Sequence, residues 1–105
     1  EVPIAAMTWG SYSINDVSAI TSHFFKHGAD DMALDDKVKA LLDTGDTTVD
    51  SAVREASYKE ALQIIADQAY WVPLWSYNTN YAFSNELNFI PSSDEIPRFF
   101  TASWK

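Results

Sequence analysis

The chain of 105 residues contains no cysteine. Disulfides and thiol chemistry are therefore excluded, and a zinc site would have no thiolate ligands. Basic residues are few, with 7 Lys and Arg against 15 Asp and Glu, so the formal net charge is −8. An acidic surface of this kind repels nucleic-acid phosphates and anionic lipid headgroups, and we expect neither as a partner.

Long hydrophobic runs are also missing. No stretch approaches the roughly 18 apolar residues that a membrane-spanning helix needs, and the longest run, AYWVPLW at 69–75, has the length of a strand. The chain begins EVPIAAM, with neither an initiator methionine nor a signal peptide. We interpret it as a piece of a larger protein, whose export signal would lie upstream.

The residues that are present are typical of a folded chain. Hydrophobic residues make up 47% and charged residues 21%, which is a globular and not a disordered composition. Aromatic residues reach 14%, and so many rings either fill a core or line a recognition surface. The length fits one small domain or part of a larger one.

The hydrophobic pattern predicts a strand, three helices and then further strands. Residues 2–9 have the pattern of a mostly buried strand, and a first helix follows that ends at Gly28. A second, short helix is capped by Asp35 and runs through Leu42, after which Gly45 and a polar loop stop it.

The third helix has the clearest pattern. The stretch DSAVREASYKEALQIIADQA at 50–69 begins with a cap, Asp50 or Ser51, and has no internal Gly or Pro. We predict a helix of about five turns that turns Lys59, Glu60, Gln63 and Asp67 toward water. Its predicted inward stripe consists of Val53, Ser57, Ala61, Ile64 and Ile65.

Residues 71–85 alternate aromatic with small or polar side chains, which predicts one extended strand or two short ones. Residues 86–97 are a predicted loop, and residues 98–105 a half-buried extended end. Isolated, these strands would leave open edges and apolar surface, so we expect them to join a larger sheet. The predicted fold class is α/β, or α+β for the fragment by itself.

Two possible metal motifs are incomplete. His23 and His27 have the i,i+4 spacing of a zinc-protease helix, but Phe24 occupies the place of the Glu base and no third ligand is evident. In the acidic stretch from Asp43, Gly45 stands at the third position, where a calcium loop needs an oxygen ligand. We therefore expect neither a metal nor a cofactor.

Catalytic motifs are weak as well. Ser11 and Ser13 lack the G-x-S-x-G setting of a nucleophile elbow. Carboxylate pairs are plentiful but lie in polar loops, whereas acid catalysis needs a carboxyl group in an apolar pocket. The pairs are Asp30 with Asp31, Asp35 with Asp36, and Asp94 with Glu95.

Aromatic residues remain as a signal for function. Each ring either packs in a core or lines a pocket, where rings supply apolar contact and polar tips supply orientation. Residues 9–16 occupy a strand-to-helix corner, where α/β proteins tend to bind ligands. A helix beginning at Asp16 would also aim backbone N–H groups at this corner, which suits a carboxylate. The rings concerned are Trp9, Tyr12, Trp71, Trp75, Tyr77 and Tyr81.

The order of these motifs is similar to that of a known family. TWGSYSINDVSAITSHFF at 8–25, VDSAVREASYKEALQIIADQAYWVPLWSYNTNYAFS at 49–84 and IPRFFTASWK at 96–105 resemble the C-terminal part of bacterial extracellular solute-binding proteins. These proteins serve peptide, oligopeptide and nickel ABC importers. The family's D-x-x-x-R-x-x-x-Y-x-x-A-x-x-I helix is matched by Asp50, Arg54, Tyr58, Ala61 and Ile64.

The resemblance implies the C-terminal portion of a type II periplasmic-binding-protein fold, in which two α/β lobes close on a ligand. Residues 1–73 would belong to the second lobe, residues 74–82 to the hinge crossover strand, and residues 83–105 to a segment that returns to the first lobe. It implies a periplasmic protein that is not an enzyme. Such a protein captures an oligopeptide or a similar small solute and delivers it to the importer permease in the inner membrane.

The resemblance also implies that Trp9, Ser11, Tyr12 and Asp16 line the ligand cleft. Trp9 would pack on the apolar body of the ligand, and Ser11 and Tyr12 would offer neutral hydrogen bonds. Tyr12 stands where peptide-binding members often carry an Asp for the ligand's α-ammonium, and a neutral phenol cannot form that charge-assisted pair. Asp16 could replace it, and a small solute other than a peptide also fits.

Two other interpretations stay open. One is a small hydrolase with an Asp/Glu pair about 5–10 Å apart and an aromatic sugar-binding surface; the other is a structural role, with every ring in the core. For the fragment by itself we expect strand pairing or exchange of elements in a homodimer. We also expect no tight binding of peptide, because half a clamp cannot enclose its ligand.

Overall fold

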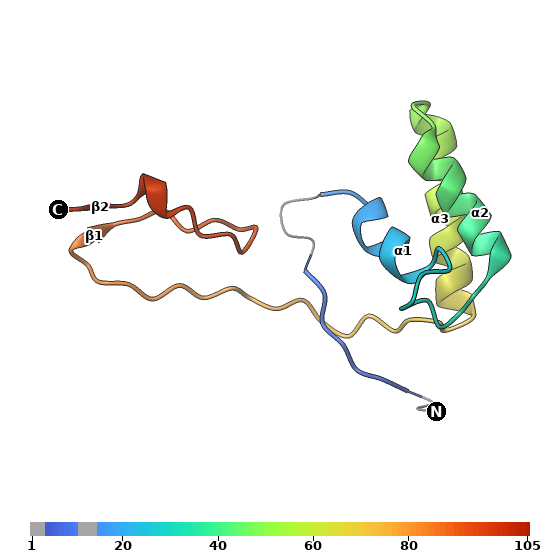
Figure 1. Cartoon of the computed structure of the whole chain (residues 1–105), viewed down its shortest axis with the longest axis horizontal. Helices are drawn as coiled ribbons and strands as arrows, with labels where there is room; N and C mark the ends of the chain where they lie inside the picture. The colour runs from blue at the N-terminus through green and yellow to red at the C-terminus, as the bar shows by residue number, and fades with distance from the viewer. Residues whose placement is uncertain (1–3, 11–14) are drawn as a thin grey trace. The chain divides into compact units, whose positions relative to one another are not determined.

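The computed structural model describes residues 4–10 and 15–105. Within these ranges the chain forms the helices α1, α2 and α3, the short strands β1 and β2, and a 3₁₀ turn, η1 (Figure 1). The chain divides into two compact units. Residues 15–74 are called the helical unit below, and residues 1–14 with 75–105 the aromatic unit.

Helix α1 (Ser18–Phe24) is shorter than predicted. The expected end at Gly28 is wrong, since Phe25 has already left the helical conformation with φ at −137°. The buried Asp31 organises the turn that follows, because its carboxylate accepts hydrogen bonds of 2.9 Å from three backbone N–H groups. These belong to His27, Ala33 and Leu34.

Helix α2 (Asp36–Thr47) begins as predicted. Asp35 caps it by accepting hydrogen bonds from the N–H groups of Lys37 and Val38, at 2.9 and 3.0 Å. The predicted end at Leu42 is wrong, as is the loop expected around Gly45, because the helix continues to Thr47. Gly45 permits close packing here: a Cβ would lie 2.8 Å from Cε1 of the Tyr58 ring.

Helix α3 (Ser51–Asp67) confirms the third prediction, with 17 residues and Asp50 as the N-cap. Its C-terminus is a Schellman motif. The Tyr70 N–H donates to the Ile65 carbonyl at 3.0 Å and the Ala69 N–H to the Ala66 carbonyl at 3.1 Å, with Ala69 at φ 52°.

The predicted inward stripe of α3 is largely correct. Ser57, Ala61 and Ile65 are buried, and the charged and amide side chains expected to face water are exposed. Val53 is the exception, with 45% of its surface exposed. Tyr58, which the predicted stripe did not include, is 5% exposed and belongs to the core.

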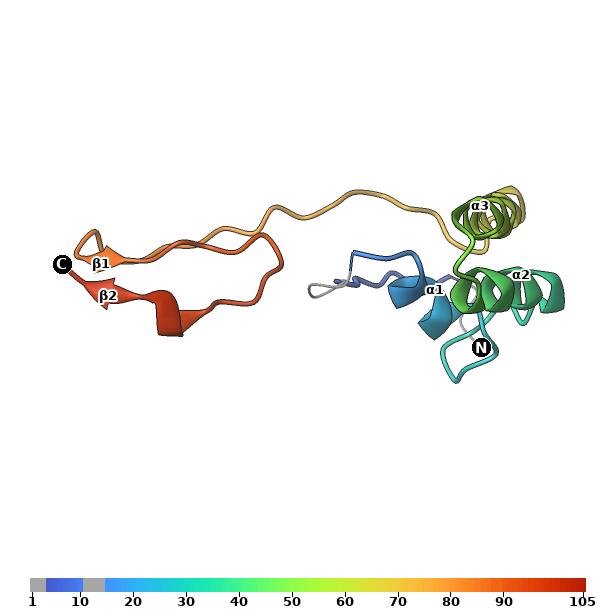
Figure 2. The same ribbon diagram turned by 90° about the horizontal axis from the view of Figure 1, so that it is seen from above.

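The core of the helical unit lies between α2 and α3, which run antiparallel side by side (Figures 1 and 2). Helix α1 and the segment after α3 complete it. Trp71 lies with its ring centroid 4.6 Å from that of Phe24 and 5.6 Å from that of Phe25. The buried hydrophobic residues are Phe24, Phe25, Val38, Leu42, Tyr58, Ala61 and Ile65.

The long strands predicted at 2–9 and 71–85 do not form in the described part of the chain. The described sheet is one antiparallel pair, β1 (Leu87–Asn88) and β2 (Ser103–Trp104), with Leu87 opposite Trp104. The predicted loop at 86–97 therefore contains β1, and the predicted extended end contains η1 (Phe99–Thr101). A strand needs a neighbour for its backbone groups, which alternation by itself does not supply.

The aromatic unit packs ring on ring. Phe89 lies at the centre, with centroid distances of 5.3 Å to Phe83, 5.8 Å to Phe99 and 6.2 Å to Tyr81. Helices and hairpin are segregated along the described chain, so the structure is mostly helical and of the α+β kind. None of the described helices is both long and apolar enough to cross a bilayer.

Candidate functional site

Asp16, one of the four residues predicted to bind ligand, lies just before α1 and is tied to α3. The Arg54 Nη2 donates to both of its carboxylate oxygens, at 2.7 Å to Oδ1 and 2.6 Å to Oδ2. The Ser18 N–H donates to Oδ1 at 2.9 Å. That hydrogen bond and the nearby Arg54 guanidinium lower the pKa of Asp16, so the carboxylate is charged at neutral pH and already paired.

Arg54 in turn rests on the buried ring of Tyr58, with its guanidinium carbon 4.9 Å from the ring centroid. Such a cation over a ring face is attracted by the ring quadrupole. The Tyr58 hydroxyl donates to Asp46 Oδ1 at 2.6 Å. A continuous polar chain therefore runs from Asp16 through α3 to α2.

Asp46 is the second junction of this chain. Its Oδ2 accepts from the Ser22 hydroxyl at 3.0 Å and from the Lys26 ammonium at 2.9 Å, and Lys26 also pairs with Asp43 at 2.7 Å. Burial disfavours the Asp46 charge, but the hydrogen bonds from Tyr58, Lys26 and Ser22 outweigh it and lower the pKa. Burial, followed by the Asp46 hydrogen bond, raises the pKa of Tyr58 to about 12.

Two open hollows adjoin the Asp16–Arg54 pair. The smaller, of about 260 Å³, is lined by Asn15, Asp16, Val17, Ser51, Arg54, Glu55 and Tyr58. The larger, of about 600 Å³, shares three of these residues and continues along α3 over Lys59, Leu62, Gln63 and Ala66. Both are exposed surface grooves of the helical unit. Neither has the enclosed shape that normally buries most of a small ligand.

The other predicted ligand residues lie elsewhere in the chain or outside the described ranges. Trp9 belongs to the aromatic unit and is 44% exposed, whereas Asp16 belongs to the helical unit. Ser11 and Tyr12 lie outside the described residues. The four residues are therefore not seen together as one site, and their ligand-binding role stays a prediction.

The backbone N–H groups that were expected to bind a ligand carboxylate at the start of α1 already donate hydrogen bonds to Asp16. Asp16 takes the Ser18 N–H through its side chain and the Ala19 N–H through its carbonyl, at 2.9 and 3.2 Å. The helix has only 7 residues. The Asp16 carboxylate would therefore repel an anion at this corner, and the neighbouring N–H donors are already bonded. Both effects disfavour anion binding here.

Arg54, Tyr58 and Asp46 were not predicted as site residues. Arg54 and Tyr58 did carry a signal, because both match the helix pattern of the resemblance and stand four residues apart on one face of α3. Asp46 carried none, since its segment was predicted as a loop and its partners are 12, 20 and 24 residues away.

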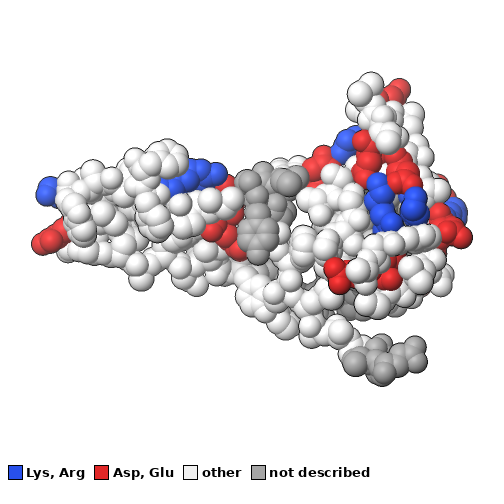
Figure 3. Space-filling model, viewed as in Figure 1, with Lys and Arg blue, Asp and Glu red and all other residues white. Residues whose placement is uncertain are grey.

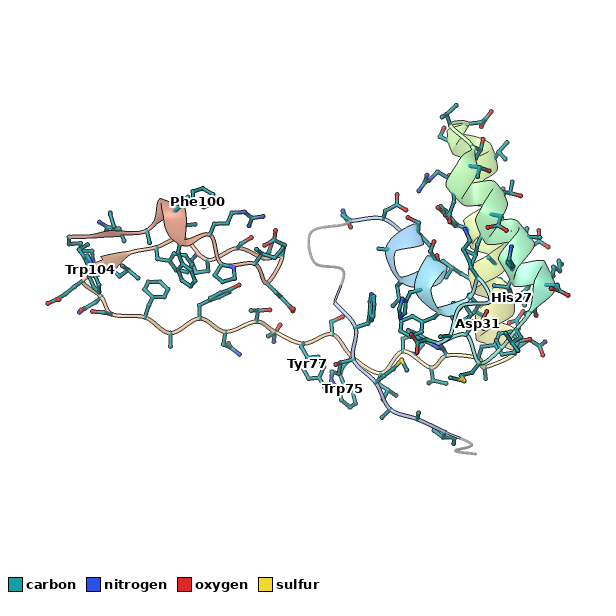
Figure 4. The ribbon with its side chains drawn as sticks, in the orientation of Figure 1. His27, Asp31, Trp75, Tyr77, Phe100 and Trp104 are labelled. Atoms are coloured by element: carbon teal, nitrogen blue, oxygen red, sulfur yellow. The ribbon has the colours of Figure 1, made fainter. Side chains whose placement is uncertain are left out.

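The two histidines do not converge on a metal site. Nε2 of His23 lies 2.8 Å from Asp30, while Nε2 of His27 lies 3.6 Å from Asp36. Figure 4 shows His27 near Asp31, whose carboxylate accepts backbone hydrogen bonds in the turn after α1. Across residues 4–10 and 15–105, no group of three or more His, Asp or Glu side chains could hold a metal ion.

The carboxylates considered for a hydrolase have structural partners. Asp35 caps α2 and accepts the Tyr70 hydroxyl at 2.9 Å. Asp94 accepts the Arg98 guanidinium at 2.6 Å and also pairs with the Ser92 hydroxyl. These contacts, led by the Val38 N–H for Asp35 and by Arg98 for Asp94, lower both pKa values. A general acid needs a raised pKa, so neither residue suits that role.

Large aromatic side chains of the aromatic unit are open to solvent. Trp75 and Tyr77 project on the same side of the extended chain (Figure 4), with ring centroids 6.2 Å apart and the rings nearly perpendicular. Charged residues of both signs gather over the helical unit in Figure 3. The most exposed rings are Trp75, Tyr77, Phe99, Phe100 and Trp104, each at least 65% exposed.

Comparison with known proteins gave no relatives: no protein-family model, no curated protein and no solved structure matches this chain.

Proposed function

We propose that the chain is the C-terminal part of a periplasmic solute-binding protein of a peptide-type ABC importer. In this proposal it belongs to a type II periplasmic-binding-protein fold and crosses between the lobes at residues 74–82. It captures an oligopeptide or a similar small solute and delivers it to the permease in the inner membrane. It performs no catalysis.

The contact between Asp16 and Arg54 is the main support for this proposal. The two residues lie 38 positions apart. Asp16 belongs to the Trp-containing corner of the family pattern, and Arg54 to its helix. Their pairing gives a physical reason for the two motifs to occur together, because the helix residue fixes the chain directly after the corner.

The extended residues 75–83 give independent support. A sheet strand has its backbone groups paired, and in the described structure no backbone hydrogen bond reaches this segment from another described residue. Trp75 and Tyr77 remain 68% and 65% exposed. A crossover strand taken out of its sheet would have these properties.

The geometry also refines the expected ligand contacts. Because Asp16 is already paired with Arg54, a ligand ammonium would have to compete with the guanidinium for the carboxylate. The proposed cleft therefore binds mainly through Trp9 and through the neutral hydroxyl groups of Ser11 and Tyr12. Such a cleft favours backbone amides and apolar groups of the solute over its α-ammonium.

Calorimetry on the protein encoded by the complete reading frame tests the proposal. Titration with a mixture of short peptides should show saturable binding, and Trp9→Ala should weaken it about tenfold by removing an aromatic anchor. Trp104→Ala is the matched control, since Trp104 is 73% exposed and lies outside the proposed cleft. The 105-residue chain alone should show no tight binding.

Two outcomes would overturn the proposal. One is a complete protein that binds neither peptides nor other small solutes. The other is tight peptide binding by the 105-residue chain alone, because a site that works without a second lobe is not half of a clamp.

A further inference from the structure

Residues 75–83, called the aromatic segment below, run as extended chain (Figure 1) and have no backbone partner among the residues that the structure describes. Among described residues, no N–H or C=O group of the segment bonds to another backbone group. Its links to neighbouring chain go through side chains: the Thr79 hydroxyl donates to Glu95 at 3.2 Å, and the Tyr81 hydroxyl to the Ser92 carbonyl at 3.0 Å. Unpaired extended backbone is a template for an added strand.

The two faces of the aromatic segment differ. Side chains alternate between faces in an extended chain, so one face carries Trp75, Tyr77, Thr79, Tyr81 and Phe83. The other carries only Ser, Asn and Ala, at positions 76, 78, 80 and 82. Tyr81 and Phe83 pack on Phe89, whereas Trp75 and Tyr77 are 68% and 65% exposed. The ring-bearing face is thus only half covered.

The charge pattern indicates which partner can approach. Residues 68–85 contain no charged side chain, in a chain whose net charge is −8. Two copies of the chain can therefore bring this stretch together without placing like charges opposite each other, which would oppose pairing. A second copy also supplies the same aromatic face, so the partner matches in chemistry.

We infer that two copies of the chain pair antiparallel through the aromatic segment, with Thr79 on the twofold axis. This register places Trp75 opposite Phe83 and Tyr77 opposite Tyr81, twice each, and aromatic cross-strand pairs stabilise sheets. Moving the axis to Asn78 or Asn80 instead sets a tyrosine opposite Thr79. A twofold axis closes the assembly at a dimer. The inference requires only the aromatic segment and does not rest on the proposed solute-binding function.

Cysteine cross-linking of the full chain tests this register, since the chain has no cysteine of its own. Thr79→Cys places two thiols opposite each other, at the Cα separation of about 4.5–5.5 Å that disulfides accept. Ser76→Cys is the matched control on the same exposed segment. In the inferred dimer its two copies lie roughly 20 Å apart along the strands, so mild oxidation should cross-link only Thr79→Cys.

Sedimentation of further variants measures the association itself. The unmodified chain should be dimeric in the micromolar range. Thr79→Lys should weaken the dimer at least about fivefold, because it sets two charges opposite each other at the axis, while Thr79→Val should leave it unchanged. The helical circular dichroism of all variants should be equal, because the helical unit has its own core.

Four results would contradict the inference. They are a monomer throughout the micromolar range, open-ended polymers in place of a dimer, equal cross-linking of the two cysteine variants, and a dimer insensitive to Thr79→Lys.

Discussion

Arg54 bonds through one nitrogen, Nη2, to both carboxylate oxygens of Asp16, across 38 residues of sequence. The pair links the chain before α1 to Arg54, the fourth residue of α3. Both side chains keep about a third of their surface exposed, so water and salt screen the attraction. Its main effect is therefore to hold Asp16, and with it the chain that leads directly into α1, next to Arg54 of α3.

A double-mutant cycle on this pair should show salt-dependent coupling. Asp16→Asn and Arg54→Gln should each lower the urea midpoint of unfolding. In the double variant the midpoint should fall by less than the sum of the two single decreases. The coupling should shrink in high salt. Lys37→Gln with Glu60→Gln is the control pair, being 66% and 53% exposed, and should couple more weakly. Additive losses at low salt would refute a direct interaction.

Gly45→Ala should destabilise the protein even though it puts a better helix former into α2. The new Cβ would lie 2.8 Å from the Tyr58 ring, and such overpacking costs about 1–3 kcal/mol. The higher helix propensity of alanine offsets about 1 kcal/mol of this cost. We therefore expect the free energy of unfolding to fall by about 1 kcal/mol.

The matched control for Gly45→Ala is Gly28→Ala. A Cβ at Gly28 meets only the His23 carbonyl at 3.5 Å, an ordinary contact. Chemical denaturation of both variants should therefore separate a packing effect from a general effect of losing glycine. Equal stability changes in the two variants would show that the Tyr58 contact does not matter.

Ala69→Gly should stabilise the protein. Ala69 has φ at 52° at the end of α3, a left-handed conformation that costs an L-residue about 1–2 kcal/mol and glycine almost nothing. After the greater unfolded-state entropy of glycine is subtracted, we expect a gain of about 0.5 kcal/mol in the free energy of unfolding. Ala66→Gly, on the exposed side of α3, should instead lower the free energy of unfolding by about 1 kcal/mol. Losses in both variants would contradict the prediction.

Tyr58 should make stability depend on alkaline pH. Its pKa is raised from 10.0 to about 12 in the folded protein. Below pH 10 the phenol is protonated in both states, and between pH 10 and 12 mainly the unfolded state ionises, so stability falls as pH rises. Urea unfolding across this range should show a shallower fall for Tyr58→Phe than for the natural chain.

The same variant has a measurable effect at neutral pH. Tyr58→Phe removes the 2.6 Å hydrogen bond to the Asp46 carboxylate and should lower the free energy of unfolding by about 1.5–3 kcal/mol, as for hydrogen bonds to charged groups. Tyr77→Phe, at a ring that is 65% exposed, should leave the free energy of unfolding unchanged. Identical alkaline profiles for the natural chain and Tyr58→Phe would contradict the assigned role.

The starts of α2 and α3 were predictable because capping is a local property, whereas α1 begins at Ser18 and not at the predicted Asp16. Asp35 and Asp50 sit directly before runs of helical periodicity, and both cap the helices expected of them. The ends of α1 and α2 were predicted wrongly because they depend on contacts made elsewhere. Gly45 lies within α2 and permits close packing there, because Tyr58, 13 residues further on, occupies the space that a side chain would need.

The candidate site was predictable only in part. The sequence singled out Asp16, but its engagement by Arg54 depends on the tertiary fold, which brings residues 38 positions apart within hydrogen-bond distance, and no local pattern reveals this. The same holds for Asp46, whose hydrogen-bond partners come from α1 and α3 as well as from the chain that follows α1.

By itself, the sequence determined the existence of three helices, two of their N-caps, most of the buried stripe of α3 and the uncharged stretch at 68–85, because these properties follow from residues a few positions apart. The tertiary structure alone decided that Asp16 is neutralised by Arg54, that Gly45 makes room for Tyr58, and that the alternating stretch at 75–83 has no backbone partner within residues 4–10 and 15–105. Each of these depends on which distant segment comes near, and a pattern within one segment cannot specify its neighbour.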